Sequence, residues 1–345
     1  MATIFELVTS DAITAYWETK VTSLPPYLGE ECWPEMQQIG LEIKWIKGSR
    51  GLPVVLRPSG YDAKAKKRNR IGFDKLSASM PFFKESTSID EEQRQQLNLV
   101  LATGNQAYID SVMNNVFDDE VRLLAGARAQ RERMRMMALT TGAISISANG
   151  QDYDYDYGMP VAHKTTVTVS WSDPAADIIG DIEAAQTKID DDTGVTPTRA
   201  VVSTKTWGYI RKNTALRNAI LGNNSGAAVT DKQITTYFMD NMNGLQIVKY
   251  TKKCIDETGS EVAFVADDIF VMFPAGALGT GWFGTTPEQS DLMTGTAANV
   301  SITDTGVAVT TSKEIDPVNV DTKVSMVYLP SFEAVDQVYV LDVIK

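Results

Sequence analysis

Cysteine and histidine are nearly absent from the sequence. Among 345 residues there are two cysteines, Cys32 and Cys254, and one histidine, His163. Two distant cysteines do not make a disulfide framework, and without a CxxC pair a structural zinc site lacks its ligands. A single histidine also excludes an HExxH metalloprotease and a three-histidine metal site. The sequence therefore predicts no metal site and no cofactor.

Long apolar runs and an excess of positive charge are missing as well. No stretch of ~18 apolar residues occurs, so no segment is predicted to span a membrane, and residues 1 to 6 do not resemble a signal peptide. Lys and Arg number 32 against 44 Asp and Glu, which gives a net charge of −12. A dedicated nucleic-acid reader carries a strongly basic face, so the charge argues against that class. These features predict a soluble protein made in a reducing cytoplasm.

Motifs of catalysis are also absent. Residues 279 to 284 match G-x-G-x-x-G, but no helix pattern follows and no βαβ unit is recognisable. The Asp-x-Asp-x-Asp run at 152 to 156 resembles the start of an EF-hand loop, yet the glycine comes one place late at Gly158. A Ser-His-Asp triad would need His163, which we interpret as an ordinary surface histidine. We predict no catalytic, cofactor-binding or metal-binding residue.

The residues that are present form five stretches, and the first is an apolar arm. Apolar residues make up 43% of the chain, an ordinary globular value, and the length predicts about two domains. In the arm, residues 1 to 48, Ser10 is expected to cap a short helix. Trp17 and Trp33 need a surface to pack against, either on the same chain or on a neighbouring subunit.

The second stretch, residues 49 to 85, reverses the sign of the charge. Residues 61 to 75 contain six basic and two acidic side chains. The run is either a solvated face or a loop that docks on an acidic patch of another copy. The residues that would make this subunit contact are Lys64, Lys66, Lys67, Arg68 and Arg70.

The third stretch carries the strongest helical signal. Ser88 and Glu91 have the spacing of a capping box. Apolar residues then follow three- and four-residue steps from 105 to 139, which predicts a helix of ~50 Å. Acidic residues lie in its first half and arginines in its second, as the helix dipole favours. Asn149 and Gly150 next predict a hairpin turn, and residues 161 to 171 are expected to form a strand.

The last two stretches mix helices and strands. Helices are expected at 177 to 189, 206 to 212 and 231 to 241. Strands are expected at 199 to 203, 245 to 251 and 261 to 273, and again at 324 to 329 and 337 to 344. Because the two kinds of element are interspersed without regular alternation, the pattern predicts an α+β fold.

The order of these parts resembles the major capsid proteins of tailed bacteriophages, in the family of the phage lambda major head protein. The similarity rests on soft patterns whose order is shared. They are Trp171–Pro174 leading into Asp177 and Asp181, the strand at 199 to 203 followed by Trp207, the strands at 245 to 250 and 264 to 273 around a turn at 256 to 259, and the glycines at 281 and 284 before Pro287.

The resemblance implies a Hong Kong 97-like capsid fold and a virion shell protein rather than an enzyme. Its implied domains are an N-terminal arm (1–48), an extended loop (49–85), a peripheral domain with a spine helix and hairpin (86–172), an axial domain (173–313) and closing strands (314–345). The implied partners are further copies in pentamers and hexamers, a separate scaffolding protein, a portal and a decoration protein. Such a shell encloses double-stranded DNA without reading its sequence.

Two alternatives stay open at this stage. One is a soluble cytoplasmic α+β enzyme or ligand-binding protein that uses residues 173 to 313. The other is an encapsulin-like shell, which would share the fold and package cargo protein.

Overall fold

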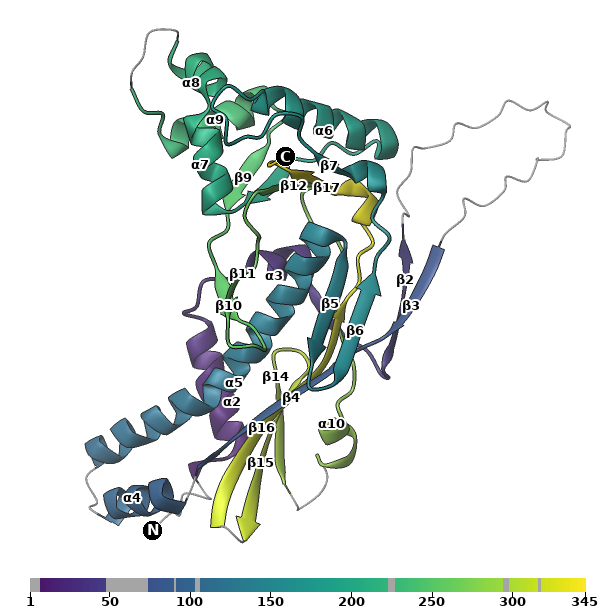
Figure 1. Cartoon of the computed structure of the whole chain (residues 1–345). Helices are drawn as coiled ribbons and strands as arrows, with labels where there is room; N and C mark the ends of the chain where they lie inside the picture. The colour runs from purple at the N-terminus through teal and green to yellow at the C-terminus, as the bar shows by residue number, and fades with distance from the viewer. Residues whose placement is uncertain are drawn as a thin grey trace, which may run out of the picture. The chain divides into compact units, whose positions relative to one another are not determined.

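The computed structural model describes residues 7–47, 74–89, 91–102, 106–222, 227–293, 298–315 and 318–345. They fall into two compact units. Unit 1 contains the described parts of Met1–Ile43, Ser77–Met134 and Thr280–Ser331, and unit 2 those of Lys44–Leu76, Arg135–Gly279 and Phe332–Lys345. The long helix α5, Gln106–Thr141, contributes residues to both units (Figure 1).

Unit 1 is built on a six-stranded sheet. Its order is β1-β13-β16-β15-β14, with β4 also paired to β16. The strands are β1 (Glu35–Gln37), β4 (Phe82–Ile89), β13 (Gly281–Phe283), β14 (Asn299–Thr303), β15 (Val307–Ile315) and β16 (Val318–Pro330). Buried residues alternate with partly exposed ones from Val320 to Val324, which is the period of two of a strand with one buried face. From Val324 to Pro330 every residue of β16 is buried, so this end of the strand is covered on both faces.

Helix α2, Ser10–Val21, packs on β14 and β15 within unit 1. Its N-cap is Thr9, whose hydroxyl accepts a hydrogen bond from the Ala12 amide at 3.3 Å. The predicted cap, Ser10, is wrong by one residue because its hydroxyl contacts Asn299 and Ser301 of β14 instead. The other helices of unit 1 are α3 (Leu28–Cys32), α4 (Glu91–Ala102) and α10 (Pro287–Asp291).

The long helix is confirmed, but the capping box before it is not. Strand β4 continues through Ser88, which pairs with Asp321 of β16, so Ser88 cannot cap α4. Helix α5 has 36 residues, and it stops where predicted, at Gly142 with φ +71°. A Cβ on Gly142 would lie 2.7 Å from Cβ of Met159, so both backbone conformation and packing require glycine there.

Unit 2 contains a five-stranded sheet of order β7-β17-β12-β8-β9. Its strands are β7 (Lys164–Thr166), β8 (Arg199–Val202), β9 (Gln246–Lys249), β12 (Ile269–Phe273) and β17 (Tyr339–Asp342). Its helices are α6 (Ile178–Thr193), α7 (Thr204–Lys212), α8 (Thr214–Leu221) and α9 (Asp231–Asn241). Ile182, Trp207, Phe238 and Phe270 join α6, α7, α9 and β12 in one buried core. Parallel and antiparallel pairings share the sheet, and the mixed architecture confirms the α+β class.

Two hairpins belong to unit 2, and a separate pair of strands, β2 (Glu42–Lys47) and β3 (Asp74–Ser79), contributes residues to both units. Strands β5 (Ala143–Ala148) and β6 (Gln151–Asp156) pair across Asn149 and Gly150, whose φ angles are +52° and +72°. This confirms the predicted turn. The aspartates of β6 are exposed, whereas its tyrosines are partly buried on the other face. Burial raises the pKa of Tyr155 to about 12. The second hairpin pairs β10 (Lys253–Ile255) with β11 (Glu261–Ala263).

Two expectations for unit 2 are wrong, and one helix was missed. Residues 161 to 171 form only the short β7 after a 3-10 turn at Val161–His163, because the Trp171 ring turns inward and donates to Asp181 at 2.8 Å. The strand expected at 261 to 273 is divided in two, with Asp268 at φ +65° between the parts. Helix α8 was not predicted.

Residues 173 to 313 do not form a single compact unit. The part up to Gly279 belongs to unit 2, and Thr280–Ser331 belongs to unit 1. The physical reason is that β13 pairs with both β1 and β16. In the part of the chain that the structure describes, no helix combines the length and the apolar character needed to cross a bilayer.

Candidate functional site

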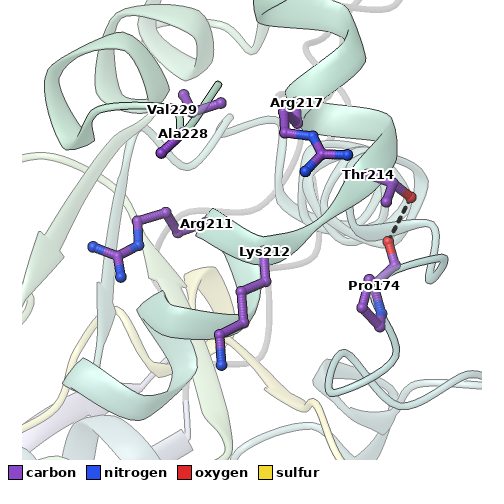
Figure 2. A pocket seen from close by; sticks show the side chains of 7 residues that line it. All are labelled: Pro174, Arg211, Lys212, Thr214, Arg217, Ala228 and Val229. Atoms are coloured by element: carbon purple, nitrogen blue, oxygen red, sulfur yellow. Dashed lines mark hydrogen bonds between the residues drawn. The ribbon is translucent and has the colours of Figure 1, made fainter. Parts of the chain in front are cut away.

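A hollow of about 650 Å³ on unit 2 is lined by cationic side chains (Figure 2). Arg211 and Lys212 extend from the end of α7, and Arg217 extends from α8. The described residues that line it are Pro174, Arg211, Lys212, Thr214, Arg217, Ala228 and Val229. None of these seven is acidic.

A short capping motif fixes the helix ends from which these cations extend, and their charged groups point in different directions (Figure 2). Asn213 ends α7 and begins α8, where its side-chain oxygen accepts from the Leu216 amide at 2.8 Å. The amide nitrogen of the same side chain donates to the Ala176 carbonyl at 2.7 Å. The Thr214 hydroxyl donates to the Pro174 carbonyl at 2.8 Å. The turn between the two helices is therefore fixed, and the cations around it project from a rigid frame.

The charge of the hollow is only partly balanced nearby. Hydrogen bonds from Lys249 and Trp207 lower the pKa of Asp231, and the nearby charge of Arg211 adds to this effect. Within the described residues, Arg211, Lys212 and Arg217 form no ion pair, whereas Lys205 of the same helix pair binds Asp268 at 2.6 Å. Nε of Arg217 is buried and has no hydrogen-bond partner there. Guanidinium groups bind carboxylates and phosphates with paired hydrogen bonds. The hollow can therefore accept an anionic group from another molecule.

The arginines of α5 are used differently, because they anchor the N-terminal region inside unit 1. Arg131 donates to Glu35 and to Asp304, both at 2.7 Å, and its side chain is 4% exposed. Arg128 forms a two-pronged pair with Glu30 at 2.6 and 3.0 Å. The Glu132 carboxylate accepts from the Gly29 amide at 3.1 Å. These pairs fix α3, β1 and the β14–β15 turn to one face of α5.

Trp17 and Trp33 lie in the core of unit 1. Their exposed fractions are 1% and 0%. Trp17 donates to the Asp304 carboxylate at 3.1 Å, and Trp33 donates to the Ser331 carbonyl at 2.8 Å. A single copy of the chain leaves almost no surface on either ring for a neighbour to cover. Of the two alternatives left open by the sequence, packing on the same chain is therefore the one observed.

The basic segment of the second stretch cannot be compared with the structure. Lys64, Lys66, Lys67, Arg68 and Arg70 lie outside the described residues. Their role as a subunit contact stays a prediction.

His163 is not a surface residue. It is 1% exposed, its Nε2 lies 3.0 Å from the Asp192 carboxylate, and its ring lies against Tyr339. Hydrogen bonds from two side chains lower the pKa of Asp192, and the bond from Lys188 has a larger effect than the bond from His163. Among the described residues, no group of three His, Cys, Asp or Glu side chains is placed to hold a metal ion.

The glycines at 281 and 284 serve close packing in unit 1. A Cβ on Gly281 would lie 2.6 Å from the Tyr328 hydroxyl, and one on Gly284 would lie 2.7 Å from the Gly40 carbonyl oxygen. Gly281 also belongs to strand β13 rather than to a loop before a helix. This environment explains the G-x-G-x-x-G match without a bound phosphate.

Replacing Gly284 with alanine is expected to lower the free energy of unfolding by about 1–3 kcal/mol, because the backbone of residue 40 cannot move aside as a side chain could. The matched control is Gly208→Ala in α7, where an added Cβ meets nothing within 4 Å. That change should stabilise by roughly 0.5–1 kcal/mol. Urea unfolding checks both, and an unchanged midpoint for Gly284→Ala would contradict the packing argument.

Comparison with known proteins agrees with this architecture. Residues 9–343 match the family described as phage major capsid protein E. The chain belongs to this family. The capsid protein gives no significant match to curated protein sequences. Its family places it in the shell of a bacteriophage head, and the role of that shell is structural.

Solved structures show the same fold at low sequence identity. A protein assigned as the capsid protein of a prophage in Escherichia coli CFT073 is 17% identical, with 79% of each chain covered and a TM-score of 0.56. A phage-related protein from Bordetella bronchiseptica RB50 is 15% identical, with 95% of this chain and 96% of that one covered and a TM-score of 0.55. The capsid of cyanophage A-1(L) is 12% identical, with 92% of each chain covered and a TM-score of 0.52. The capsid protein thus has the Hong Kong 97-like fold of tailed-phage heads.

Proposed function

We propose that the capsid protein assembles as pentamers and hexamers around a separate scaffolding protein, and that the finished shell carries a portal and a decoration protein. It is made in the bacterial cytoplasm and catalyses no reaction. Its shell encloses double-stranded DNA without reading the sequence, because a chain of net charge −12 repels DNA more than it binds it.

The observation that carries this proposal is apolar surface that one copy leaves uncovered. Met36 of β1 is 53% exposed, and Ile39 and Leu41, between β1 and β2 (Glu42–Lys47), are 98% and 54% exposed. Neighbouring apolar side chains with this exposure are typical of a protein–protein contact. Unit 2 also exposes apolar side chains, because Val161 is 85% and Ile255 is 75% exposed.

The basic segment supplies a second contact in this proposal. Replacing Lys66, Lys67 and Arg68 together with glutamate is expected to reduce shell formation by roughly tenfold or more, because like charges would then face each other across the contact. Electron microscopy counts the shells, and circular dichroism shows whether the monomer still folds. The charge-preserving control exchanges Lys and Arg at the same three positions. Normal shells from the glutamate variant would refute docking by this segment.

A further inference from the structure

Unit 2 separates its charges onto different helices. Helix α6 contains five acidic residues and one lysine: Asp181, Glu183, Asp190, Asp191, Asp192 and Lys188. Helices α7 and α8 contain four basic residues and no acidic one: Lys205, Arg211, Lys212 and Arg217. One unit therefore carries a basic surface on α7 and α8 and a cluster of three aspartates, Asp190 to Asp192, at the C-terminal end of α6.

The two surfaces lie at opposite ends of α6. Its N-terminal end follows Pro174, which lines the hollow and bonds to Thr214. Its C-terminal end holds Asp190 to Asp192, where Asp192 reaches His163 beside β7. Asp190 lies 12 residues after Ile178, the first residue of α6 (190 − 178), a distance of about 18 Å along the helix axis. Figure 1 shows α6 running away from α7 and α8 across the unit. Hence the hollow and the acidic end cannot pair within one chain.

Both surfaces remain available for a partner. Asp190 and Asp191 are both exposed, and the Asp190 carboxylate accepts a hydrogen bond from the Thr196 hydroxyl at 2.9 Å. Asp192 is already held by Lys188 and His163. On the other side, Arg217 and Lys212 have no ion-pair partner in the described part of the chain.

We propose that the basic hollow of one copy binds the Asp190–Asp191 end of α6 of the next copy. Carboxylates at the tip of a helix are the anions that paired guanidinium and ammonium groups bind well. Since the two surfaces differ and lie at opposite ends of the unit, the contact is head-to-tail, and such contacts close into rings when the rotation allows it. The inference rests on the proposed self-assembly and names the pair of surfaces that would close the capsomer.

A charge exchange tests this pairing. The basic variant combines Lys212→Glu with Arg217→Glu, and the acidic variant combines Asp190→Lys with Asp191→Lys. Each is expected to reduce the yield of rings and shells by roughly tenfold or more at low salt. The fourfold variant, which exchanges the two charges, should recover most of the yield. Electron microscopy and sedimentation velocity measure the yield, and thermal unfolding of the monomers shows whether each variant folds.

The matched control is Glu183→Lys, an exposed acid on the same helix about 10 Å from Asp190. It should assemble normally, whereas Asp191→Lys alone should not. If the basic variant fails and the fourfold variant stays equally defective, another anion occupies the hollow, and the proposal is overturned. Normal shells from both double variants would also overturn it. If the unaltered protein itself forms no shell, the proposed self-assembly fails first, so the two failures can be told apart.

Discussion

Replacing Arg131 with methionine is expected to lower the free energy of unfolding by about 3–5 kcal/mol, because it leaves two carboxylates without their shared partner in a buried site. Glu35 and Asp304 each lie 2.7 Å from this guanidinium, and their side chains are 19% and 17% exposed. Asp304 also accepts from Trp17, so the loss should spread to the N-terminal helix. Chemical unfolding followed by tryptophan fluorescence measures the change.

The control for this experiment is Arg122→Met on the same helix. Arg122 lies 3.3 Å from Asp119, and the two side chains are 80% and 67% exposed. Such a surface pair contributes about 0–1 kcal/mol. Equal losses for Arg131→Met and Arg122→Met would show that the buried pairs do not hold the arm to α5.

Glu120→Gln is expected to stabilise the protein at pH 8 and to have little effect at pH 5. Glu120 is 2% exposed, and its Oε2 has no hydrogen-bond partner in the described part of the chain. Burial, with Asp119 and Asp321 nearby, raises the pKa of Glu120 from 4.5 to about 7. The folded protein therefore holds a proton on this carboxyl that the unfolded chain releases above pH 4.5. The stability due to that proton is complete below pH 4.5 and is lost as the pH rises through 7.

The size of the effect follows from the pKa shift. At 1.36 kcal/mol for each pKa unit, charging Glu120 at pH 8 costs roughly 3 kcal/mol, which glutamine avoids. Unfolding of both proteins between pH 5 and pH 8 measures the difference. Asp119→Asn removes the neighbouring, exposed carboxyl and should change stability by about 0.5 kcal/mol or less at either pH. A constant difference between Glu120→Gln and the unaltered protein would contradict the burial argument.

Local signals explain what the sequence predicted well. Helix α5 and the β5–β6 hairpin depend on apolar spacing, on the stop at Gly142 and on the turn at Asn149 and Gly150. These features act between residues near one another in the chain, so their pattern is visible without the fold. The resemblance to the phage capsid family is confirmed by the family match over residues 9–343.

Distant partners explain what the sequence did not predict. Ser88 has the spacing of a helix cap, but β16 pairs with it from more than 200 residues away. His163 is buried by Asp192 and Tyr339, and neither lies near it in the chain. The sequence alone does not decide whether Trp17 and Trp33 pack on the same chain or on a neighbour. The fold decides it, because it brings Asp304 to Trp17 and Ser331 to Trp33.

The basic hollow could also be predicted only in part from the sequence. Residues 204 to 221 contain four basic side chains and no acidic one, and this signal was present in the sequence. Its meaning depended on α8, which was not predicted, and on Pro174, which the fold brings to Thr214. The separation of this hollow from the acidic end of α6 is a property of the folded unit and could not be read from spacing alone.

Electron microscopy of the recombinant capsid protein, alone and with candidate scaffolding proteins, tests the central claim most directly. The account predicts closed shells, tubes or rings of five and six copies in at least one of these conditions. A protein that stays monomeric or dimeric with every scaffold tested, at low salt and high concentration, would contradict it.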